Sequence, residues 1–411
     1  MLAAQWRGQT LPGADPALQA PNLARLAREG VAFERAYGAL PEAAPSRASL
    51  LTGKYPHACG VTANGQRLPE DAATLARELG RAGYETGYIG LWGLDGDADP
   101  GYVPPGARRH GFEHWAAFNR GHRYQTPVYF RDDPEPVRAK GFEPDVQAAR
   151  AIEFIRRKRT APFFLVVSWG PPHPPRVPPP RFAAMYRDAP FTLRHNVPAE
   201  LAEMARPAWA DYYAMCSAID ACAGKLMDTL RESGRLDDTV VVFTSDHGDM
   251  LYSHGLHGGG EPFEESVRVP LIIRYPRAIA DASARTLPVV TVDLAPALLS
   301  WAGVAAPPDI QGIDIAGQLT GRERRESVFC QGRLGTPQEW RLVVRGFDKL
   351  VADRDLRVTH LFNLQQDPYE LENLAVAPSR RTRRDEMRAL LEYWMRRTGD
   401  QILPSGLKLR D

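Results

Sequence analysis

Several features that would assign the chain to a class at once are scarce in its sequence. Only four cysteines occur in 411 residues: Cys59, Cys216, Cys222 and Cys330. Their spacing matches neither a zinc site nor a disulfide framework, so we expect free thiols in a reducing compartment. Basic and acidic residues balance to a formal charge of +1, which gives no global field that would attract nucleic acid or an anionic membrane. We therefore expect no nucleic-acid partner, and any anion site must be local.

Long hydrophobic runs are also missing. No apolar run approaches the roughly 20 residues that a membrane-spanning helix needs. Residues 1–7 lack the basic flank followed by a long apolar core that marks a secretory signal. The chain as given therefore predicts a cytoplasmic protein without a membrane partner.

What the sequence does contain is an alternation of apolar runs and helical patterns. The runs predicted as buried strands are 83–90, 162–169, 239–245, 269–275 and 289–292. Apolar residues recur at intervals of three and four in 21–30, 75–82, 145–157 and 212–233, which predicts helices. This alternation favours an α/β fold with a large mixed, mostly parallel sheet between helices. Ligands of such sheets bind beyond the carboxyl ends of the strands.

The pattern changes after about residue 316. Closely spaced strands are predicted at 327–331, 341–345, 349–352 and 359–363, followed by a long helix at 382–397. We therefore divide the chain into an α/β domain of residues 1–315 and a small subdomain of residues 316–411, an antiparallel sheet with a helix. The proline-rich segment 171–180 is predicted to be a loop, because its prolines exclude a helix and a central strand.

One segment near the N-terminus carries the most specific motif. The run Glu42-Ala43-Ala44-Pro45-Ser46-Arg47-Ala48-Ser49-Leu50-Leu51-Thr52-Gly53 resembles the sulfatase signature. In that family, a Cys or Ser two positions before the Pro-Ser-Arg is oxidised to formylglycine, the nucleophile. Ala43 stands at this position, and a methyl side chain cannot become an aldehyde.

The resemblance to sulfatases extends over nearly the whole chain. Residues 239–250 resemble the family's second metal motif, 262–270 the segment that follows it, and 361–374 its C-terminal closing motif. The resemblance implies a fold of the alkaline-phosphatase superfamily, of the formylglycine sulfatase and phosphonate monoester hydrolase type. It also implies a metal ion, usually calcium, beside the formylglycine.

Four polar residues match roles that this family assigns. Asp246 and His247 match the later metal pair, Arg47 matches the signature arginine whose planar fork suits a tetrahedral oxyanion, and His173 resembles the histidine of the family's Pro-His loop. Each residue has a plainer reading. Asp246 and His247 can be a capping residue and a surface histidine, Arg47 a buried structural arginine, and His173 an exposed loop residue.

Other positions of the family's site have lost their functional side chains. Ala3 and Ala4 stand where the opening motif carries acidic metal ligands. Leu91 and Gly93 replace the lysine and histidine of a Gly-Lys-Trp-His-Leu motif, and Gly259 stands where a lysine is usual. A hard dication collects six or more oxygen ligands, so affinity for calcium should collapse.

These losses lead to our hypothesis of a pseudosulfatase. Because removing one member of a catalytic unit commonly costs a factor of ~10⁴ or more, the chain should lack formylglycine-dependent activity. Arg47 and His173 would remain as anion contacts, and Asp246 with His247 as the remnant of a metal corner whose occupancy is open. The partner would be a small anion in this pocket or another protein.

An alternative is a divergent hydrolase or lyase of sulfate-type or phosphate-type esters with a rebuilt metal site. Glu42 lies beside the missing nucleophile, and His254 and His257 could join Asp246 and His247 around zinc, which needs only four ligands and accepts nitrogen donors. Whether the protein is an enzyme therefore stays open at this stage.

The start of the chain raises one further expectation. In the family's fold the opening motif follows a central β-strand, and almost nothing precedes it here. Either the natural chain starts upstream of Met1, where a signal segment would change the compartment, or part of the central strand is missing and leaves backbone groups unpaired.

Overall fold

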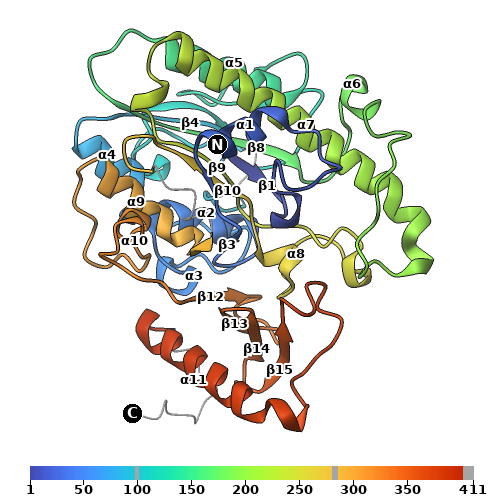
Figure 1. Ribbon diagram of the computed structural model, residues 1–411. Coiled ribbons are helices and arrows are strands. Elements are labelled where there is room, and N and C mark those ends of the chain that lie inside the picture. The colour runs from blue at the N-terminus through green and yellow to red at the C-terminus, as the bar shows by residue number, and fades with distance from the viewer. Residues whose placement is uncertain (98–100, 280–285, 401–411) are drawn as a thin grey trace.

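A seven-stranded sheet forms the centre of the molecule (Figure 1). The computed structural model describes residues 1–97, 101–279 and 286–400. The strands of this sheet are β1 (Leu2–Ala4), β2 (Val31–Ala32), β4 (Glu85–Leu91), β5 (His114–Phe118), β8 (Phe163–Pro172), β9 (Val241–Ser245) and β10 (Leu271–Arg274). Their order is β2-β10-β9-β1-β8-β4-β5. The strands from β9 to β5 run parallel, whereas β10 is antiparallel to β9 and β2. The predicted α/β fold with a mixed, mostly parallel sheet is confirmed.

Helices cover both faces of this sheet. They are α1 (Pro21–Glu29), α2 (Ala43–Thr52), α4 (Leu75–Arg81), α5 (Glu143–Arg156), α7 (Ala202–Glu232) and α9 (Leu294–Trp301), with the shorter α3 (Pro56–Cys59), α6 (Pro180–Ala183), α8 (Glu264–Val267) and α10 (Ile315–Leu319). In β8, Val167 and Trp169 pack in a buried cluster with α1, α5 and α7, whereas Val166 packs with α2 and α4. Alternate residues of one strand thus reach opposite layers, as the pleat of a strand dictates. Figure 1 shows α5 and α7 on one side of the sheet and α4, α9 and α10 on the other.

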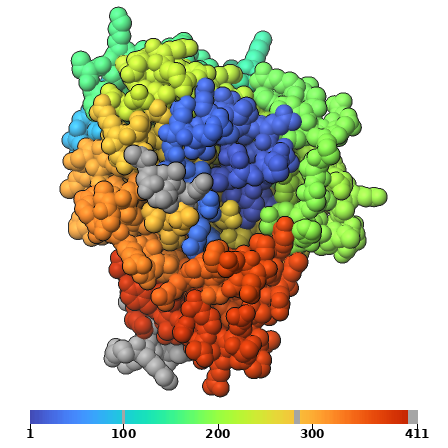
Figure 2. Space-filling view, in the orientation of Figure 1, coloured from blue at the N-terminus to red at the C-terminus, as the bar shows by residue number. Residues whose placement is uncertain are grey.

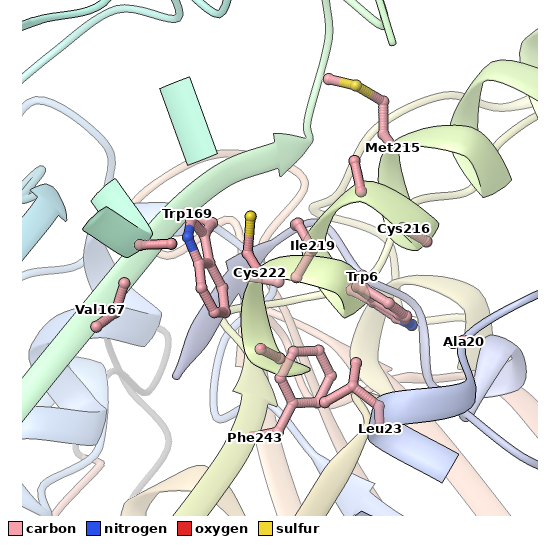
Figure 3. Packing of buried hydrophobic residues seen from close by; sticks show 14 of the residues in the cluster. Trp6, Ala20, Leu23, Val167, Trp169, Met215, Cys216, Ile219, Cys222 and Phe243 are labelled. Atoms are coloured by element: carbon pink, nitrogen blue, oxygen red, sulfur yellow. The ribbon is translucent and has the colours of Figure 1, made fainter. Parts of the chain in front are cut away.

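The larger hydrophobic core lies between the sheet and α7 (Figure 3). Trp6 meets Phe243 edge to face, with ring centroids 5.1 Å apart and ring planes at 81°. Ile219 and Cys222 of α7 are buried in the same cluster. All four cysteines are buried and free, which confirms the prediction of unpaired thiols.

β1 is short for a central strand. It pairs with β8 only from Ser168 onward and with β9 only at Thr244 and Ser245, so the earlier residues of β8 pair with β4 alone. A largely apolar cavity of about 560 Å³ lies beside the amino end of β1, lined by β8, β9 and helices of both layers. The amino group of Met1 donates to the carbonyl of Val242 over 2.9 Å, and burial lowers the pKa of this amino group to about 5.

The C-terminal part is a four-stranded antiparallel sheet with a helix across it. Its strands are β12 (Ser327–Gly332), β13 (Trp340–Arg345), β14 (Asp348–Asp353) and β15 (Val358–Asn363), paired in sequence order, and the helix is α11 (Arg381–Thr398). Trp394 of α11 lies parallel to Phe329 of β12, with ring centroids 6.4 Å apart. Figure 2 shows this part, in red, against the lower side of the larger body. The division of the chain at residue 316 stays a prediction.

Several local predictions need correction. Pro171 and Pro172 belong to β8 and not to a loop, because they end the strand where its ladder with β1 is irregular and a residue without an N–H is tolerated. The predicted strand at 289–292 is β11 (Pro288–Val290), which pairs with β3 (Arg35–Tyr37) outside the large sheet. A further hairpin joins β6 (Val128–Tyr129) and β7 (Val137–Arg138). Within the described ranges, no helix has the length and apolar content needed to cross a membrane.

Candidate functional site

The residues singled out by sequence gather at the carboxyl ends of β1, β8 and β9. These three strands are parallel neighbours, so the loops that follow them meet at one edge of the sheet. Asp246 follows β9 directly, and His173 follows β8. Arg47 reaches the same place from α2. The structure therefore brings all four of these predicted residues to one site, with His247 next to Asp246.

Arg47 and Asp246 form a buried ion pair across this site. Arg47 Nη2 lies 3.1 Å from Asp246 Oδ2, and the two side chains are 1% and 0% exposed. Arg47 Nη1 donates to the Leu91 carbonyl over 2.7 Å and to Ser168 Oγ over 2.5 Å. The guanidinium is therefore engaged by protein groups, in agreement with the reading of Arg47 as a structural arginine.

The carboxylate of Asp246 is equally occupied. Its Oδ1 accepts the backbone N–H of Gln5 at 3.0 Å and that of His247 at 2.8 Å, while Oδ2 faces Arg47. Burial alone would raise the pKa of Asp246, but His247, Arg47 and these two N–H groups outweigh it and lower the pKa below its ordinary value. Asp246 is thus an ionised carboxylate whose charge is balanced inside the protein.

The residues of this corner do not fit a calcium ion. His247 Nδ1 lies 2.7 Å from the carbonyl oxygen of Gly248, so one ring nitrogen is already used. In the described parts of the chain, no three His, Cys, Asp or Glu side chains stand close enough together to hold a metal ion. Calcium takes six to eight oxygen ligands, whereas both oxygens of Asp246 accept hydrogen bonds from the protein. We therefore derive no chemistry through a metal here.

The signature segment begins α2 beside this corner. Ala43 is the first residue of the helix and is half-buried. Ser46 donates its hydroxyl to the carbonyl of Asp246, which ties α2 to the end of β9. Glu42, the N-cap residue, lies close enough to His247 and Arg333 for their charges to lower its pKa, although burial raises that pKa more.

Two of the residues in the alternative metal site point elsewhere. The ring of His254 stacks on Phe263, with centroids 4.1 Å apart and planes at 17°, and its Nε2 lies 3.2 Å from Asn196 Nδ2. His257 is exposed and contacts Tyr252 edge to face. Of the added residues, only Glu42 therefore comes near His247.

Gly259 shows why no side chain stands at that position. A Cβ there would lie 2.4 Å from the carbonyl oxygen of Pro41 and 2.6 Å from His247 Nδ1, closer than real Cβ contacts. The lysine that the family resemblance expects has no room in this backbone. Gly93, in contrast, has a φ of +74° and its nearest neighbour, Arg47 Cδ, at 3.7 Å.

This crowding makes a testable prediction. Gly259→Ala should lower the free energy of unfolding by about 1–3 kcal/mol, because the backbone at Pro41 or the ring of His247 must shift. As a matched control, Gly80→Ala in α4 meets only Thr86 Cγ2 at 3.9 Å and should stabilise the protein by about 0.5–1 kcal/mol. Urea unfolding of both variants measures the difference, and equal stability of Gly259→Ala and the parent would contradict it.

The structure adds residues to which the sequence assigned no role. His122, in the loop between β5 and β6, stacks on His173 with ring centroids 4.0 Å apart. Arg176 pairs with Asp249, and Asp249 Oδ1 accepts the backbone N–H groups of Leu251 and Gly258 at 2.8 and 3.0 Å. The sequence held a weak signal for Arg176 and Asp249, because each lies three residues beyond a predicted site residue. It held none for His122.

Comparisons with known proteins find relatives over nearly the whole chain. The family model described as Sulfatase matches residues 11–304, and the model of the C-terminal part of N-sulphoglucosamine sulphohydrolase matches residues 253–397. An ulvan-active sulfatase from Formosa agariphila is 32% identical over 98% of this chain and 81% of its own length. Choline-sulfatase from Rhizobium meliloti is 29% identical, with 91% and 81% covered.

Solved structures are similar as well. A sulfatase-type protein of Bacteroides fragilis superposes with a TM-score of 0.89 and 27% identity, covering 98% of this chain and 95% of the other. A phosphonate monoester hydrolase from Silicibacter pomeroyi superposes with a TM-score of 0.82 over 98% of this chain and 95% of its own. Its identity of 22% shows a shared fold alone.

Proposed function

Because this chain belongs to the sulfatase family, whose members include hydrolases of sulfuric esters, we propose that it is a pseudosulfatase. In this proposal it keeps the family's scaffold without formylglycine-dependent sulfatase activity. Its site binds a small anion, or the scaffold serves a partner protein. The enzyme relatives favour a hydrolase, whereas the residues of this chain argue against one.

The observation that carries the proposal is the buried pair of Arg47 and Asp246. The family resemblance assigns Arg47 to the substrate and Asp246 to a metal ion. In this chain the two side chains instead neutralise each other at 3.1 Å. Breaking such a pair leaves a buried charge without a partner, which costs about 3–5 kcal/mol. Recruiting either residue for a metal ion or a substrate therefore requires a new partner for the other.

Ala43 and Gly259 support the same conclusion from another side. Ala43 has no heteroatom for conversion to an aldehyde, and Gly259 has no space for a lysine. A site without the nucleophile and this lysine lacks two members of the catalytic unit together, and the effects of such losses are not additive.

The proposal is tested by turnover of a chromogenic aryl sulfate. The protein is purified with calcium after co-expression with a sulfatase maturase, next to Ala43→Cys, which returns the oxidisable side chain. We expect no multiple turnover by either form, because the other losses remain. Hydrolysis beyond one equivalent by the parent chain would overturn the proposal, whereas activity only in Ala43→Cys would place the whole defect at residue 43.

The alternative, a divergent hydrolase or lyase, has one observation in its favour. Glu42 lies near His247 and is half-buried beside Ala43. A carboxylate whose pKa burial raises is a candidate general base. In that case an ester hydrolase activity would be lost in Glu42→Gln and kept in Glu261→Gln, whose carboxylate pairs with Arg333.

A further inference from the structure

The apolar cavity beside the amino end of β1 is a slot one strand wide in the middle of the large sheet. β1 lies between β8 and β9 and pairs with both, so these two strands stand two strand spacings apart, about 9.6 Å. Leu2 is opposite Ser168, and β8 continues back from there to Phe163 without β1 beside it. The cavity of about 560 Å³ lies between β8 and β9 in this stretch.

The β8 edge of the slot presents backbone groups that no other strand pairs. Glu85 of β4 donates its backbone N–H to the carbonyl of Pro162 over 2.9 Å. Successive residues of a parallel strand bond alternately to its two neighbours, so Phe163 and Leu165 direct their N–H and C=O groups away from β4 and into the slot. Among the described residues these two have no ladder partner on that side, and they are only half-buried although β8 is a central strand.

The β9 edge faces the slot in the same way. Thr244 donates its backbone N–H to the carbonyl of Met1 over 3.1 Å, and the amino group of Met1 donates to the carbonyl of Val242 over 2.9 Å. The even-numbered residues of β9 therefore face β1, so the N–H of Val242 and both backbone groups of Val240 point into the slot ahead of Met1. Inside a sheet such N–H and C=O groups need hydrogen-bond partners, and the slot offers them on both edges.

Apolar side chains from helices of both layers line the two faces of the slot. Those from α5 and α7 are Ile155, Leu226, Met227 and Leu230, and those from α4 and α9 are Leu75, Leu79, Leu294, Leu298 and Trp301. The charged lining residues Arg159, Arg235 and Asp238 are bound to other groups of the protein. The slot therefore fits an occupant that is apolar on both faces and carries N–H and C=O groups along both edges, which describes a strand buried in a parallel sheet.

We propose that the slot is the seat of an extended apolar segment joined to Met1, as in a longer form of this polypeptide, and that this segment lengthens β1 by four residues. Because Leu2 is opposite Ser168, Met1 is opposite Val167, and the next four positions fall opposite residues 166, 165, 164 and 163. In this register the segment donates to the carbonyls of Leu165 and Val240 and accepts their unpaired neighbours. An aliphatic ligand fills the same volume but leaves these backbone groups without partners, which costs free energy.

The amino group of Met1 favours a covalent continuation over a separate peptide. It lies in line with the ladder between β1 and β9, since it donates to the carbonyl of Val242. Burial lowers the pKa of this amino group to about 5, because the charged form is poorly solvated there. A peptide bond at this nitrogen keeps the N–H that Val242 accepts and removes the titrating amine. A separate peptide would instead place its own end against the buried amine.

Adding Val-Ile-Val-Ile directly ahead of Met1 tests this proposal. The Tm of the extended chain should be higher by about 5 °C, because four apolar residues become buried and the edges of the slot gain hydrogen bonds. Amide hydrogen exchange at Leu165 and Val242 should slow by at least about tenfold. The matched control adds Val-Pro-Val-Pro, which has the same length and is equally apolar, but its prolines lack two of the N–H groups that a strand needs. It should change neither the Tm nor the exchange.

Two additions to the unmodified chain distinguish the other occupants: dodecanoate, and the free peptide Val-Ile-Val-Ile with both ends blocked. A Tm raised by dodecanoate but not by the attached segment would make the cavity a site for aliphatic ligands and overturn the proposal. A Tm raised by the free peptide but not by the attached segment would assign the slot to a separate polypeptide and overturn it as well. An extended chain that folds with unchanged Tm and unchanged exchange would contradict the proposal directly. None of these results bears on the proposed function, whose site lies at the opposite, carboxyl ends of the strands.

Discussion

Arg47→Met should lower the free energy of unfolding by about 3–5 kcal/mol, because it leaves the carboxylate of Asp246 buried without its cation. Methionine keeps an unbranched apolar stem and removes the guanidinium with its charge. Arg47 also holds Ser168 Oγ and the Leu91 carbonyl, so the variant loses contacts to β8 and β4 at the same time. Urea unfolding at neutral pH measures the loss.

The matched control for Arg47→Met is Arg156→Met. Arg156 pairs with Glu232, and the two side chains are 63% and 66% exposed, so the loss there should stay within about 1 kcal/mol. A double variant, Arg47→Met with Asp246→Leu, should be more stable than the sum of the single losses predicts, because an apolar pair leaves no buried charge. Additive losses would contradict a direct interaction.

The pH dependence of Arg47→Met follows from the same pair. In the unmodified chain the pKa of Asp246 is below its ordinary value, so its contribution is present above about pH 4 and is lost only as the pH falls through the lowered pKa. Without Arg47, one of the charges that lower the pKa of Asp246 is gone while the effect of burial stays, so this pKa rises and the folded variant binds a proton more readily than the folded unmodified chain. The stability deficit of Arg47→Met should therefore shrink between pH 7 and pH 5, and a deficit that grows on acidification would contradict the account.

Lys349→Met is expected to cost a similar amount, about 3–5 kcal/mol, in the C-terminal sheet. Lys349 is fully buried in β14, with Nζ at 3.2 Å from Glu264 Oε1 and 2.7 Å from Glu370 Oε1. Glu264 belongs to α8, so this ammonium ties the C-terminal sheet to the larger body. Burial lowers the pKa of Lys349, but the two carboxylates raise it more, so the lysine is charged.

The size of this second effect should depend on pH. Burial raises the pKa of Glu370 to about 8 in spite of Lys349, so its share of the stability is present below its unfolded pKa, near 4.5, and is lost as the pH rises toward 8. Removing the lysine raises that pKa further, so Lys349→Met should lose more at pH 8.5 than at pH 6. Lys225→Met is the control, since Lys225 is 48% exposed beside Asp145 and should cost no more than about 1 kcal/mol.

Much of the fold is predictable from the sequence because its elements carry strong patterns. β4, β8, β9 and β10 are short apolar runs between turns, and α7 repeats apolar residues at helical intervals. β1 cannot be predicted from such patterns, because its three residues are too few to show a periodicity. It forms only because β8 and β9 flank it. Helix α2 cannot be predicted from a pattern either, because nearly all of its faces are buried and its apolar residues form no single stripe.

The sequence predicts which residues belong to the candidate site, but not which of them contact one another. Motif resemblance indicates Arg47, His173, Asp246 and His247, yet it assigns Arg47 and Asp246 to different ligands. Their direct contact joins residues 199 positions apart, and no spacing rule encodes it. His122 is a single loop histidine in sequence, and only the return of its loop over the end of β8 places it on His173. Tertiary contacts of this kind decide what a remnant site still does.

The most direct test of the central claim, that Asp246 is committed to Arg47 and not to a metal ion, is thermal unfolding of the purified protein in calcium, zinc and chelator, with metal content measured by mass spectrometry. We expect metal far below one equivalent and the same Tm in all three conditions. One equivalent of bound metal whose removal lowers the Tm would contradict it, because a ligand that binds only the folded state must stabilise that state.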